Sequence, residues 1–211
     1  KWHLEHPRAP YVPSGNNKGA TKWEDWTSPD RRHSFDFWYA YNTWDDHFHP
    51  HYWTNTSKRL QGRVEVNQWS TEHETDVAIK LLKTKRDTTK PFAIFVSYNP
   101  PHMPYGVCPA KYKKMYAGKT FEQLNTRKTM HPGTSMEAYA KKNLKNYFAC
   151  ITGVDDNFGR LLKTLKDEGL DENTIVIFTS DNGNNLGSQN MISKNNHYDE
   201  SLVVPFLIRW P

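Results

Sequence analysis

The chain has 211 residues, enough for one large domain, and 36% of them are hydrophobic, which is on the polar side for a complete globular core. Aromatic residues make up 14%, which excludes disorder over most of the length, because disordered chains lack large apolar side chains. The formal net charge of +5 favours anionic partners, but the basic residues are scattered and form no nucleic-acid-binding tail. No apolar run approaches the length of a membrane-spanning helix.

The cysteines and the two ends of the chain bear on its context. Cys108 and Cys150 lack metal-site spacing and leave the redox compartment undecided. The sequence starts at Lys1 without Met and stops at Pro211 directly after an apolar run. We therefore expect an internal fragment, in which the lack of a targeting segment carries no information about export.

Residues 5–70 are rich in Pro, Asn, Asp, Trp, Tyr and His and have little periodicity. Short strands are expected near 35–39 and 51–53, and ordered loop elsewhere. Long ordered loops in compact domains commonly serve binding, so we expect 5–70 to be a loop-rich, substrate-facing insertion and 71–211 to be the core portion.

A histidine-rich stretch within this segment is a candidate binding surface. Asp46, His47 and His51 lie beside Tyr52 and Trp53, a combination typical of surfaces that bind sugars. A purely structural aromatic cluster explains the composition equally well. His47, His49 and His51 also alternate, so on a strand they would point the same way and could mimic a zinc site, a weaker interpretation.

Regular elements are predicted from residue 71 onward. Thr71 and Glu74 form a capping box that begins a helix. An apolar run at 92–97 predicts a buried strand, and the prolines of 98–104 predict a stiff, extended loop after it. Residues 105–135 have the composition of a basic loop.

The second half of the chain predicts an α/β fold. A continuous apolar stripe predicts a helix over 136–166, with Gly169 as its C-cap. Residues 174–179 predict a strand buried on both faces, and 202–208 predict another. This order indicates a mostly parallel mixed β-sheet sandwiched between helices.

Two of the predicted strands end in polar segments, where open α/β sheets place their sites. His102 follows the first strand and offers a proton donor or anion ligand. Asp181 and Asn182 follow the second and offer hard oxygen ligands suited to Ca²⁺ or Mg²⁺. Lys194 offers an anion contact. Taken singly, an ordinary loop histidine, a plain turn and a solvated lysine explain these residues better.

Together, four segments resemble the sulfatase family of the alkaline phosphatase superfamily, in the family's order and over essentially the whole chain. The four segments are Lys1-Trp2-His3-Leu4 (family KWHLG), Pro100-Pro101-His102-Met103-Pro104 (PPHxP), Ser180-Asp181-Asn182-Gly183 with Leu186-Gly187-Ser188 (SD(N/H)G…LGSH), and Lys194 with Glu200-Ser201-Leu202 and Val204-Pro205 (K…ESLRVP). Their spacing is more specific than any one of them alone.

The resemblance implies a partial catalytic domain of a sulfuric ester hydrolase over 1–211, with these roles. Asp181 and Asn182 bind the divalent cation, usually Ca²⁺. Lys1 and Lys194 hold sulfate oxygens. His3 contacts the nucleophile, and His102 protonates the leaving alcohol. The implied location is periplasmic, secreted or lysosomal.

The sequence departs from the family at several points. The formylglycine motif C/S-x-P-x-R fits neither cysteine, and the paired aspartates of the metal site are missing; both are expected upstream, so this fragment is expected to be inactive alone. Gln189 stands where many members have His, and Val203 where many have Arg.

The sequence leaves three functions open. The first is cleavage of sulfate esters, with a sulfated small molecule or saccharide as substrate and neither nucleic acid nor a membrane span involved. A phosphodiesterase or phosphonate monoester hydrolase of the same superfamily is the second. The third is a non-catalytic module that binds anionic polymers, which predicts affinity falling steeply with salt.

Overall fold

A computed structural model describes residues 26–42, 46–58 and 62–211. Lys1 and His3 lie outside the described residues. The chain divides into two compact units, 1–107 and 108–211, each of which is described by itself. Within the described residues, no helix is both long enough and apolar enough to cross a membrane.

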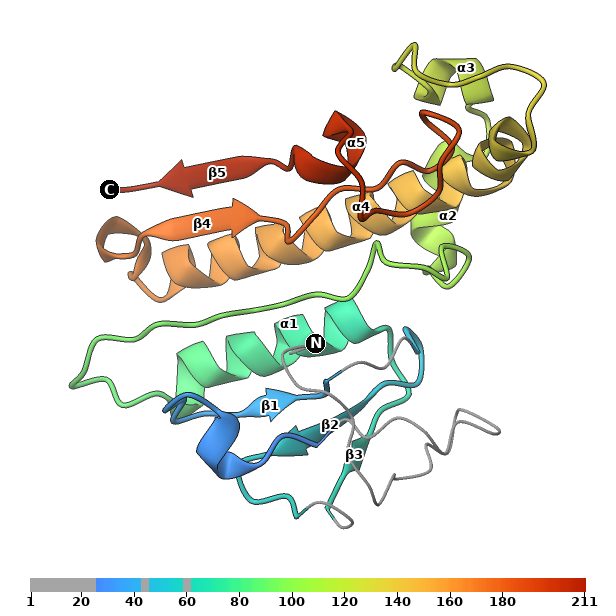
Figure 1. The fold of residues 1–211 in the computed structure, drawn as a ribbon. Coiled ribbons are helices and arrows are strands. Elements are labelled where there is room, and N and C mark those ends of the chain that lie inside the picture. The colour runs from blue at the N-terminus through green and yellow to red at the C-terminus, as the bar shows by residue number, and fades with distance from the viewer. Residues whose placement is uncertain (1–25, 43–45, 59–61) are drawn as a thin grey trace. The chain divides into compact units, whose positions relative to one another are not determined.

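The first unit contains a small antiparallel sheet, a helix and a short helical turn (Figure 1). Its elements in chain order are η1 (Pro29–Arg31), β1 (Tyr39–Ala40), β2 (His51–Thr54), β3 (Val64–Glu65), α1 (Ser70–Lys80) and the π-helical turn η2 (Leu81–Lys85). Strand β2 pairs with both β1 and β3. Tyr41, Tyr52 and Trp53 form the core of this unit, because large aromatic side chains bury the most apolar area.

Helix α1 packs against this sheet through hydrogen bonds with two tyrosines of the sheet. Tyr52 Oη donates to Glu74 Oε1 at 2.9 Å, and Tyr39 Oη lies 2.7 Å from His73 Nε2. The helix that we assigned to the core portion therefore belongs structurally with the loop-rich segment, and the observed division falls after Val107 instead of near residue 70.

The capping box predicted for α1 is wrong. Trp69 is the N-cap and makes no side-chain cap, while the backbone N–H of Ser70 donates to the His47 carbonyl at 2.7 Å. Thr71 is fully buried, and Glu74 turns inward to Tyr52. The two side chains that the local pattern assigned to the cap are thus engaged in tertiary packing instead.

The second unit is organised around one long helix. Its elements are α2 (Ala110–Tyr116), α3 (Phe121–Leu124), α4 (Ser135–Asp167), η3 (Asp171–Asn173), β4 (Val176–Thr179), α5 (Asp199–Leu202) and β5 (Phe206–Arg209). Figure 1 shows β4 lying along α4, with β5 on the other side of β4. The rings of Phe158 on α4 and Phe178 on β4, 4.8 Å apart, join helix and strand.

Helix α4 confirms the predicted helix to within a residue at each end. Thr134 caps its start by accepting from the Glu137 N–H at 3.1 Å, and Gly169 follows its end with φ +65°. The N–H of Leu170 donates to the Leu165 carbonyl at 2.8 Å, which closes the left-handed C-terminal turn.

The α/β class is confirmed, but the strand pairs among the described residues are antiparallel, including β4 with β5. The described residues therefore contain none of the parallel strand pairs of the expected mixed sheet. Residues 92–97, predicted as a buried strand, are extended without ladder pairing, and Phe95 is 72% exposed. No backbone hydrogen bond joins Phe92–Val96 to another described residue.

Candidate active site

The candidate metal ligands follow β4 directly. Asp181 is exposed, and its Oδ1 accepts from the Asn182 N–H at 2.9 Å. Ser180 Oγ donates to the Asn182 carbonyl at 2.9 Å, which tightens the turn. Among the described residues, no hydrogen bond occupies Asp181 Oδ2 or the Asn182 side-chain oxygen. The two side chains thus offer two hard oxygens, a donor type that fits Ca²⁺ or Mg²⁺.

These two residues do not complete a metal site. In residues 26–42, 46–58 and 62–211, no group of three or more His, Cys, Asp or Glu side chains is arranged to hold a metal ion. Ca²⁺ takes six to eight oxygen ligands, so further ligands must come from elsewhere in the protein. The expected upstream aspartate pair would supply them.

Gly183 fixes the turn against α5. Its N–H donates to the Ser201 carbonyl at 2.9 Å. A Cβ at this position would lie 2.2 Å from the Glu200 carbonyl oxygen, a distance that only a glycine avoids. The close backbone approach therefore sets where the Asp181–Asn182 turn stands relative to the segment that follows Lys194.

Glu200 links this turn to the loop before α4. Its carboxylate is buried; Thr129 Oγ1 donates to Oε1 at 2.6 Å, and Arg127 Nη1 lies 3.6 Å from the same oxygen. Burial acts to raise the pKa of Glu200, but the hydrogen bonds from Thr129 and the backbone and the charge of Arg127 lower it below its ordinary value. Glu200 is therefore held as a carboxylate.

Lys194 lies in a loop of unusual backbone conformation. Its two neighbours, Ser193 and Asn195, have φ of +67° and +69°. Further positive φ angles in the same loop occur at Leu186, Gln189 and Asn190. The Asn185 N–H donates to the Ser193 carbonyl at 2.7 Å, which holds the loop in place. Positive φ angles in non-glycine residues are enriched at functional sites, and the role of Lys194 stays a prediction.

His102 lies in the first unit, on a loop that starts from the end of the extended 92–97 segment. The Asn99 carbonyl accepts from the His102 N–H at 3.0 Å. His102 Nδ1 lies 2.9 Å from the Met103 carbonyl, and because a carbonyl only accepts, Nδ1 carries a proton. Nε2 is therefore the ring atom that can exchange a proton with a substrate.

The three candidate substrate-binding residues differ in exposure. Asp46 is partly exposed, and its Oδ1 accepts from the N–H groups of Phe48 and His49 at 3.1 and 2.8 Å. His47 is fully buried and His51 is 2% exposed on β2, where its ring meets Trp53 edge-on at 5.1 Å. Burial favours a supporting role for both imidazoles over direct contact with a sugar, and the substrate-binding prediction stays untested.

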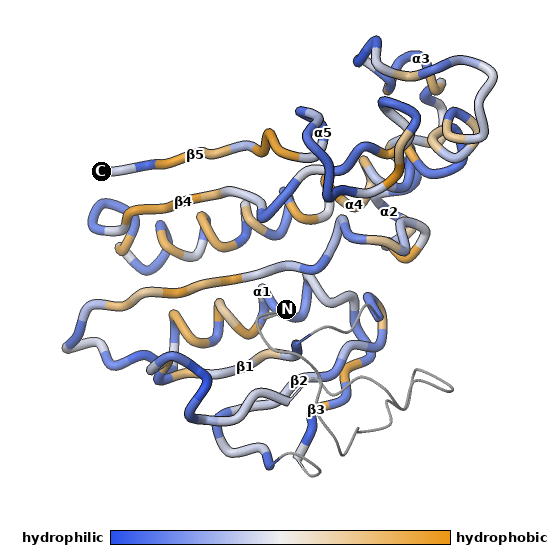
Figure 2. Tube along the Cα trace, viewed as in Figure 1, coloured by the Kyte–Doolittle hydropathy of each residue, from blue (hydrophilic) through white to orange (hydrophobic). Residues whose placement is uncertain are grey.

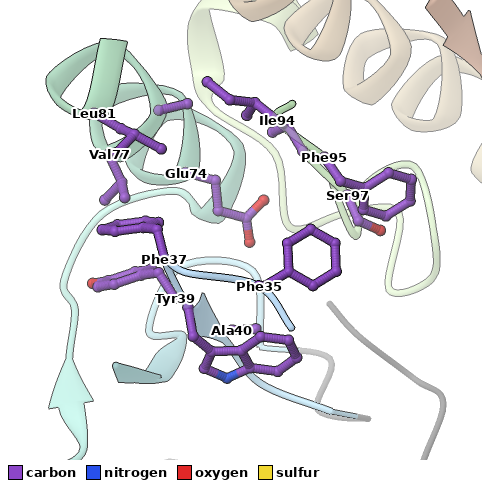
Figure 3. Close-up of a pocket in the computed structure, with 13 residues that line it drawn as sticks. Phe35, Phe37, Tyr39, Ala40, Glu74, Val77, Leu81, Ile94, Phe95 and Ser97 are labelled. Carbon is purple, nitrogen blue, oxygen red and sulfur yellow. The ribbon is translucent and has the colours of Figure 1, made fainter. Parts of the chain in front are cut away.

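An apolar pocket with a single carboxylate, which no sequence pattern indicated, lies inside the first unit. Figure 3 shows Glu74 projecting from α1 toward Phe37 and Tyr39 on one side and Ile94 and Phe95 on the other. The pocket is lined by Phe35, Phe37, Trp38, Tyr39, Ala40, Glu74, Val77, Ala78, Leu81, Ile94, Phe95, Val96 and Ser97.

Burial dominates the electrostatics of this pocket. It raises the pKa of Glu74 to about 7, against the opposing effect of the Tyr52 hydrogen bond. It also raises the pKa of Tyr39 to about 12, with the nearby Glu74 charge adding to the effect, and lowers the pKa of His73. Glu74 Oε2 is buried with no hydrogen-bond partner among the described residues. The inward orientation of the Glu74 carboxyl could not be predicted from the sequence, because Thr71 and Glu74 have the spacing of a capping box.

The structure places the predicted catalytic residues in separate groups. Asp181, Asn182 and Lys194 belong to the unit of residues 108–211, and His102 to the unit of residues 1–107. Lys1 and His3 are not described. That all six line one pocket therefore remains a prediction.

Comparison with known proteins identifies the family. The family model described as Sulfatase matches residues 11–211. The chain is 39% identical over 196 residues to an endo-4-O-sulfatase of Bacteroides thetaiotaomicron, covering 90% of this chain and 37% of that protein. It is 32% identical over 216 residues to an ulvan-active sulfatase of Formosa agariphila, covering 100% of this chain and 37% of that protein.

A solved structure agrees with these matches. One from Bacteroides fragilis, named as the sulfatase YidJ, superposes with a TM-score of 0.92 at 43% identity, covering 100% of this chain and 45% of that one. The chain thus spans less than half the length of each of these three proteins. With a family model that matches nearly its whole length, the chain belongs to the sulfatase family of the alkaline phosphatase superfamily.

Proposed function

We propose that the protein containing this chain hydrolyses sulfate esters of a saccharide, using a divalent cation and a formylglycine in the segment upstream of Lys1. The 39% identity over 196 residues to an endo-4-O-sulfatase carries the proposal. The name of the ulvan-active relative, which places a sulfatase on another sulfated polysaccharide, supports the substrate class. As in other members of the family, we expect a periplasmic, secreted or lysosomal location.

Each candidate catalytic or metal-binding residue has a role in this reaction. Asp181 and Asn182 hold Ca²⁺, or Mg²⁺, whose charge offsets that of the sulfate oxygens. Lys1 and Lys194 bind the same oxygens, and this contact strengthens as charge shifts onto them in the transition state. His3 contacts the nucleophile.

His102 is the proposed general acid. Its Nδ1–H donates to the Met103 carbonyl, so Nε2 is the ring atom proposed to carry the proton that is transferred. That proton passes from Nε2 to the bridging oxygen of the leaving alcohol. Asp46, backed by His47 and His51, is proposed to face the saccharide.

Leaving-group dependence tests the role of His102 in the full-length enzyme with its formylglycine confirmed by mass spectrometry. The His102→Ala variant should lose about 10²- to 10⁴-fold in kcat on a sulfated saccharide, whose alkoxide is a poor leaving group, and far less on an aryl sulfate. His131→Ala, at an exposed loop histidine of the second unit, is the matched control. Equal losses on both substrates would show that His102 is not the acid.

Metal dependence tests Asp181 separately. Chelation should abolish activity on both substrates, and Ca²⁺ should restore it in the wild type. The Asp181→Ala variant should need far more Ca²⁺ for half-maximal activity, whereas Asp199→Asn, at an exposed carboxylate on α5, should behave as wild type. Full activity after complete metal removal would exclude the proposed cation.

Matched sulfate and phosphate esters of one alcohol distinguish the proposal from a phosphodiesterase or phosphonate hydrolase. A higher kcat/KM on the sulfate is expected. A preference for the phosphate, in enzyme with confirmed formylglycine, would replace the proposed function by the alternative.

A further inference from the structure

All of the chain's net positive charge lies in one segment of the second unit. Residues 108–145 contain nine lysines and arginines against two glutamates and no aspartate, whereas the whole chain carries a formal net charge of +5. The rest of the chain is therefore weakly acidic. Four lysines of the segment are exposed, and their ammonium groups make no hydrogen bond or ion pair with another described residue; these are Lys114, Lys119, Lys128 and Lys142.

Two lysines of α4 hold the connection between α2 and α3 beside that helix. Lys145 Nζ donates to the Ala117 carbonyl at 3.1 Å, and Lys141 Nζ lies 5.5 Å from the centroid of the Phe121 ring. Lys119 stands between these two contact points in the chain. The fold thus gathers the three lysines at the end of α4 that carries α2 and α3 (Figure 1). Together with the adjacent Lys142, they form a basic surface.

This basic surface borders the loop that carries Lys194. The Gln189 N–H of that loop donates to the Thr129 carbonyl at 2.7 Å, in the segment that leads from α3 to α4. A Cβ added at Gly187 would lie 2.9 Å from Ala140 Cβ, on the second turn of α4. The loop with the candidate sulfate ligand therefore packs on the same part of α4 that carries the basic surface.

We propose that the basic surface binds the polysaccharide chain beyond the ester that is cleaved, so that several sulfate groups of one polymer hold it at the site at once. This rests on the proposed function, because the partner is the sulfated saccharide whose ester is hydrolysed. Lysine suits such a partner: an ammonium group is a compact charge on a flexible stem, so it can follow sulfates at different positions along a chain.

The charges of the basic surface are only slightly offset within the protein. Glu137 lies 2.9 Å from Lys141 Nζ and compensates part of its charge. The other three lysines have no acidic partner among the described residues. Because exposed charges interact over only about 8 Å at physiological salt, the contacts with the polymer should weaken steeply as salt is added.

Two matched double variants of the full-length protein test the proposal. Lys141→Gln/Lys142→Gln removes two charges from the basic surface. Lys163→Gln/Lys166→Gln removes two charges from the same helix, about 33 Å further along its axis. Each pair also breaks one ion pair between residues four apart, Lys141 with Glu137 and Lys163 with Asp167, so the cost to the helix is similar.

Binding is measured with dextran sulfate by titration calorimetry at several salt concentrations, with unsulfated dextran as the uncharged control. The Kd for dextran sulfate should rise about tenfold in the basic-surface variant and stay at the wild-type value in the control variant. The plot of log Kd against log salt should become shallower by about one unit in the basic-surface variant alone. This measurement requires no turnover.

Inhibition kinetics connect the basic surface to the reaction. Dextran sulfate should inhibit hydrolysis of 4-nitrophenyl sulfate by the wild type, and its inhibition constant should rise about tenfold in the basic-surface variant but not in the control variant. Equal changes in the two double variants, or a Kd that Lys141→Gln/Lys142→Gln leaves unaltered, would overturn the proposal. Tighter binding of duplex DNA than of dextran sulfate would replace the polysaccharide by a nucleic acid. Failure of the proposed function is a separate result, because it shows as no turnover of any sulfate ester.

Discussion

Glu74 shows how a single carboxyl can couple stability to pH. Its pKa is raised from an ordinary 4.5 to about 7, so the folded state prefers the protonated form. The stabilisation is complete below pH 4.5 and is lost as pH rises through about 7, because deprotonation leaves a buried charge. Glu74→Gln should therefore gain stability over the wild type between pH 5 and 8, by up to about 3 kcal/mol at the alkaline end.

Urea unfolding at several pH values measures this effect. The matched control is Glu72→Gln, which removes a carboxyl from the same helix and should not reproduce the gain in stability of Glu74→Gln. A Glu74→Gln variant whose stability follows the wild type in parallel from pH 5 to 8 would show that the carboxyl is not buried as described.

Gly183 is the second residue at which adding a single atom, a Cβ, should have a large effect. A Cβ there would stand 2.2 Å from the Glu200 carbonyl oxygen and 3.0 Å from its carbon, and backbone atoms cannot rotate aside. Gly183→Ala should cost about 2 kcal/mol or more and weaken Ca²⁺ binding, because the turn that carries Asp181 must move.

Gly159 is the matched control for this substitution. It lies on α4, and an added Cβ would meet nothing within 4 Å among the described residues. Gly159→Ala should stabilise the protein by about 0.5–1 kcal/mol through helix propensity. Thermal unfolding and calcium titration measure both variants; equal effects at the two glycines would contradict the close approach at Gly183.

At the scale of elements, the cap of α4 is a local device that can be tested alone. Thr134 accepts from the Glu137 N–H at 3.1 Å. Thr134→Ala should cost about 1 kcal/mol, and Thr134→Ser should restore most of the loss, because the hydroxyl and not the methyl makes the bond. Chemical denaturation of the wild type and the two variants measures these differences. If Thr134→Ser were as destabilising as Thr134→Ala, loss of the capping hydrogen bond would be excluded as the cause.

The elements predicted correctly are those whose signal is long or locally complete. Helix α4 has a stripe over many turns, and Gly169 supplies the left-handed residue that its end requires. The short helices α2 and α3 were assigned to loop, although Thr120 and Gln123 form a true capping box at α3. Thr71 and Glu74 offered the same pattern at α1, where burial overrode it.

Strand formation needs partners that local sequence cannot reveal. Residues 92–97 have the composition of a buried strand yet pair with no other described strand, because pairing depends on a partner strand and not on local composition alone. The order of the motifs identified four candidate site residues, His102, Asp181, Asn182 and Lys194. For the same reason, no local pattern could show whether their side chains lie close together. The buried Glu74 and the Glu200 contacts arise from tertiary packing and had no sequence signal.

At the scale of the whole molecule, the exposed apolar surface on β5 and just after it predicts an interface. Phe206, Leu207 and Ile208 are 64%, 61% and 54% exposed and Trp210 is 76% exposed, and Figure 2 shows β5 as one of the most hydrophobic segments of its unit. The chain spans 37% of the length of both the endo-4-O-sulfatase and the ulvan-active sulfatase, and we expect parts of a sulfatase that these 211 residues do not include to cover this strand. Contiguous apolar surface of this kind marks an interface.

A charge placed on this surface should have opposite effects in the two contexts. In the isolated 211-residue chain, Leu207→Glu should lower the binding of a hydrophobic dye and reduce aggregation, because the side chain there meets water. In the full-length protein the same substitution should cost about 2–4 kcal/mol, because it buries an unpaired charge. Dye fluorescence and thermal unfolding of both pairs of proteins measure the contrast. Equal tolerance in the two contexts would mean that nothing covers β5, and the strand would then lie at an exposed edge of the complete sulfatase domain.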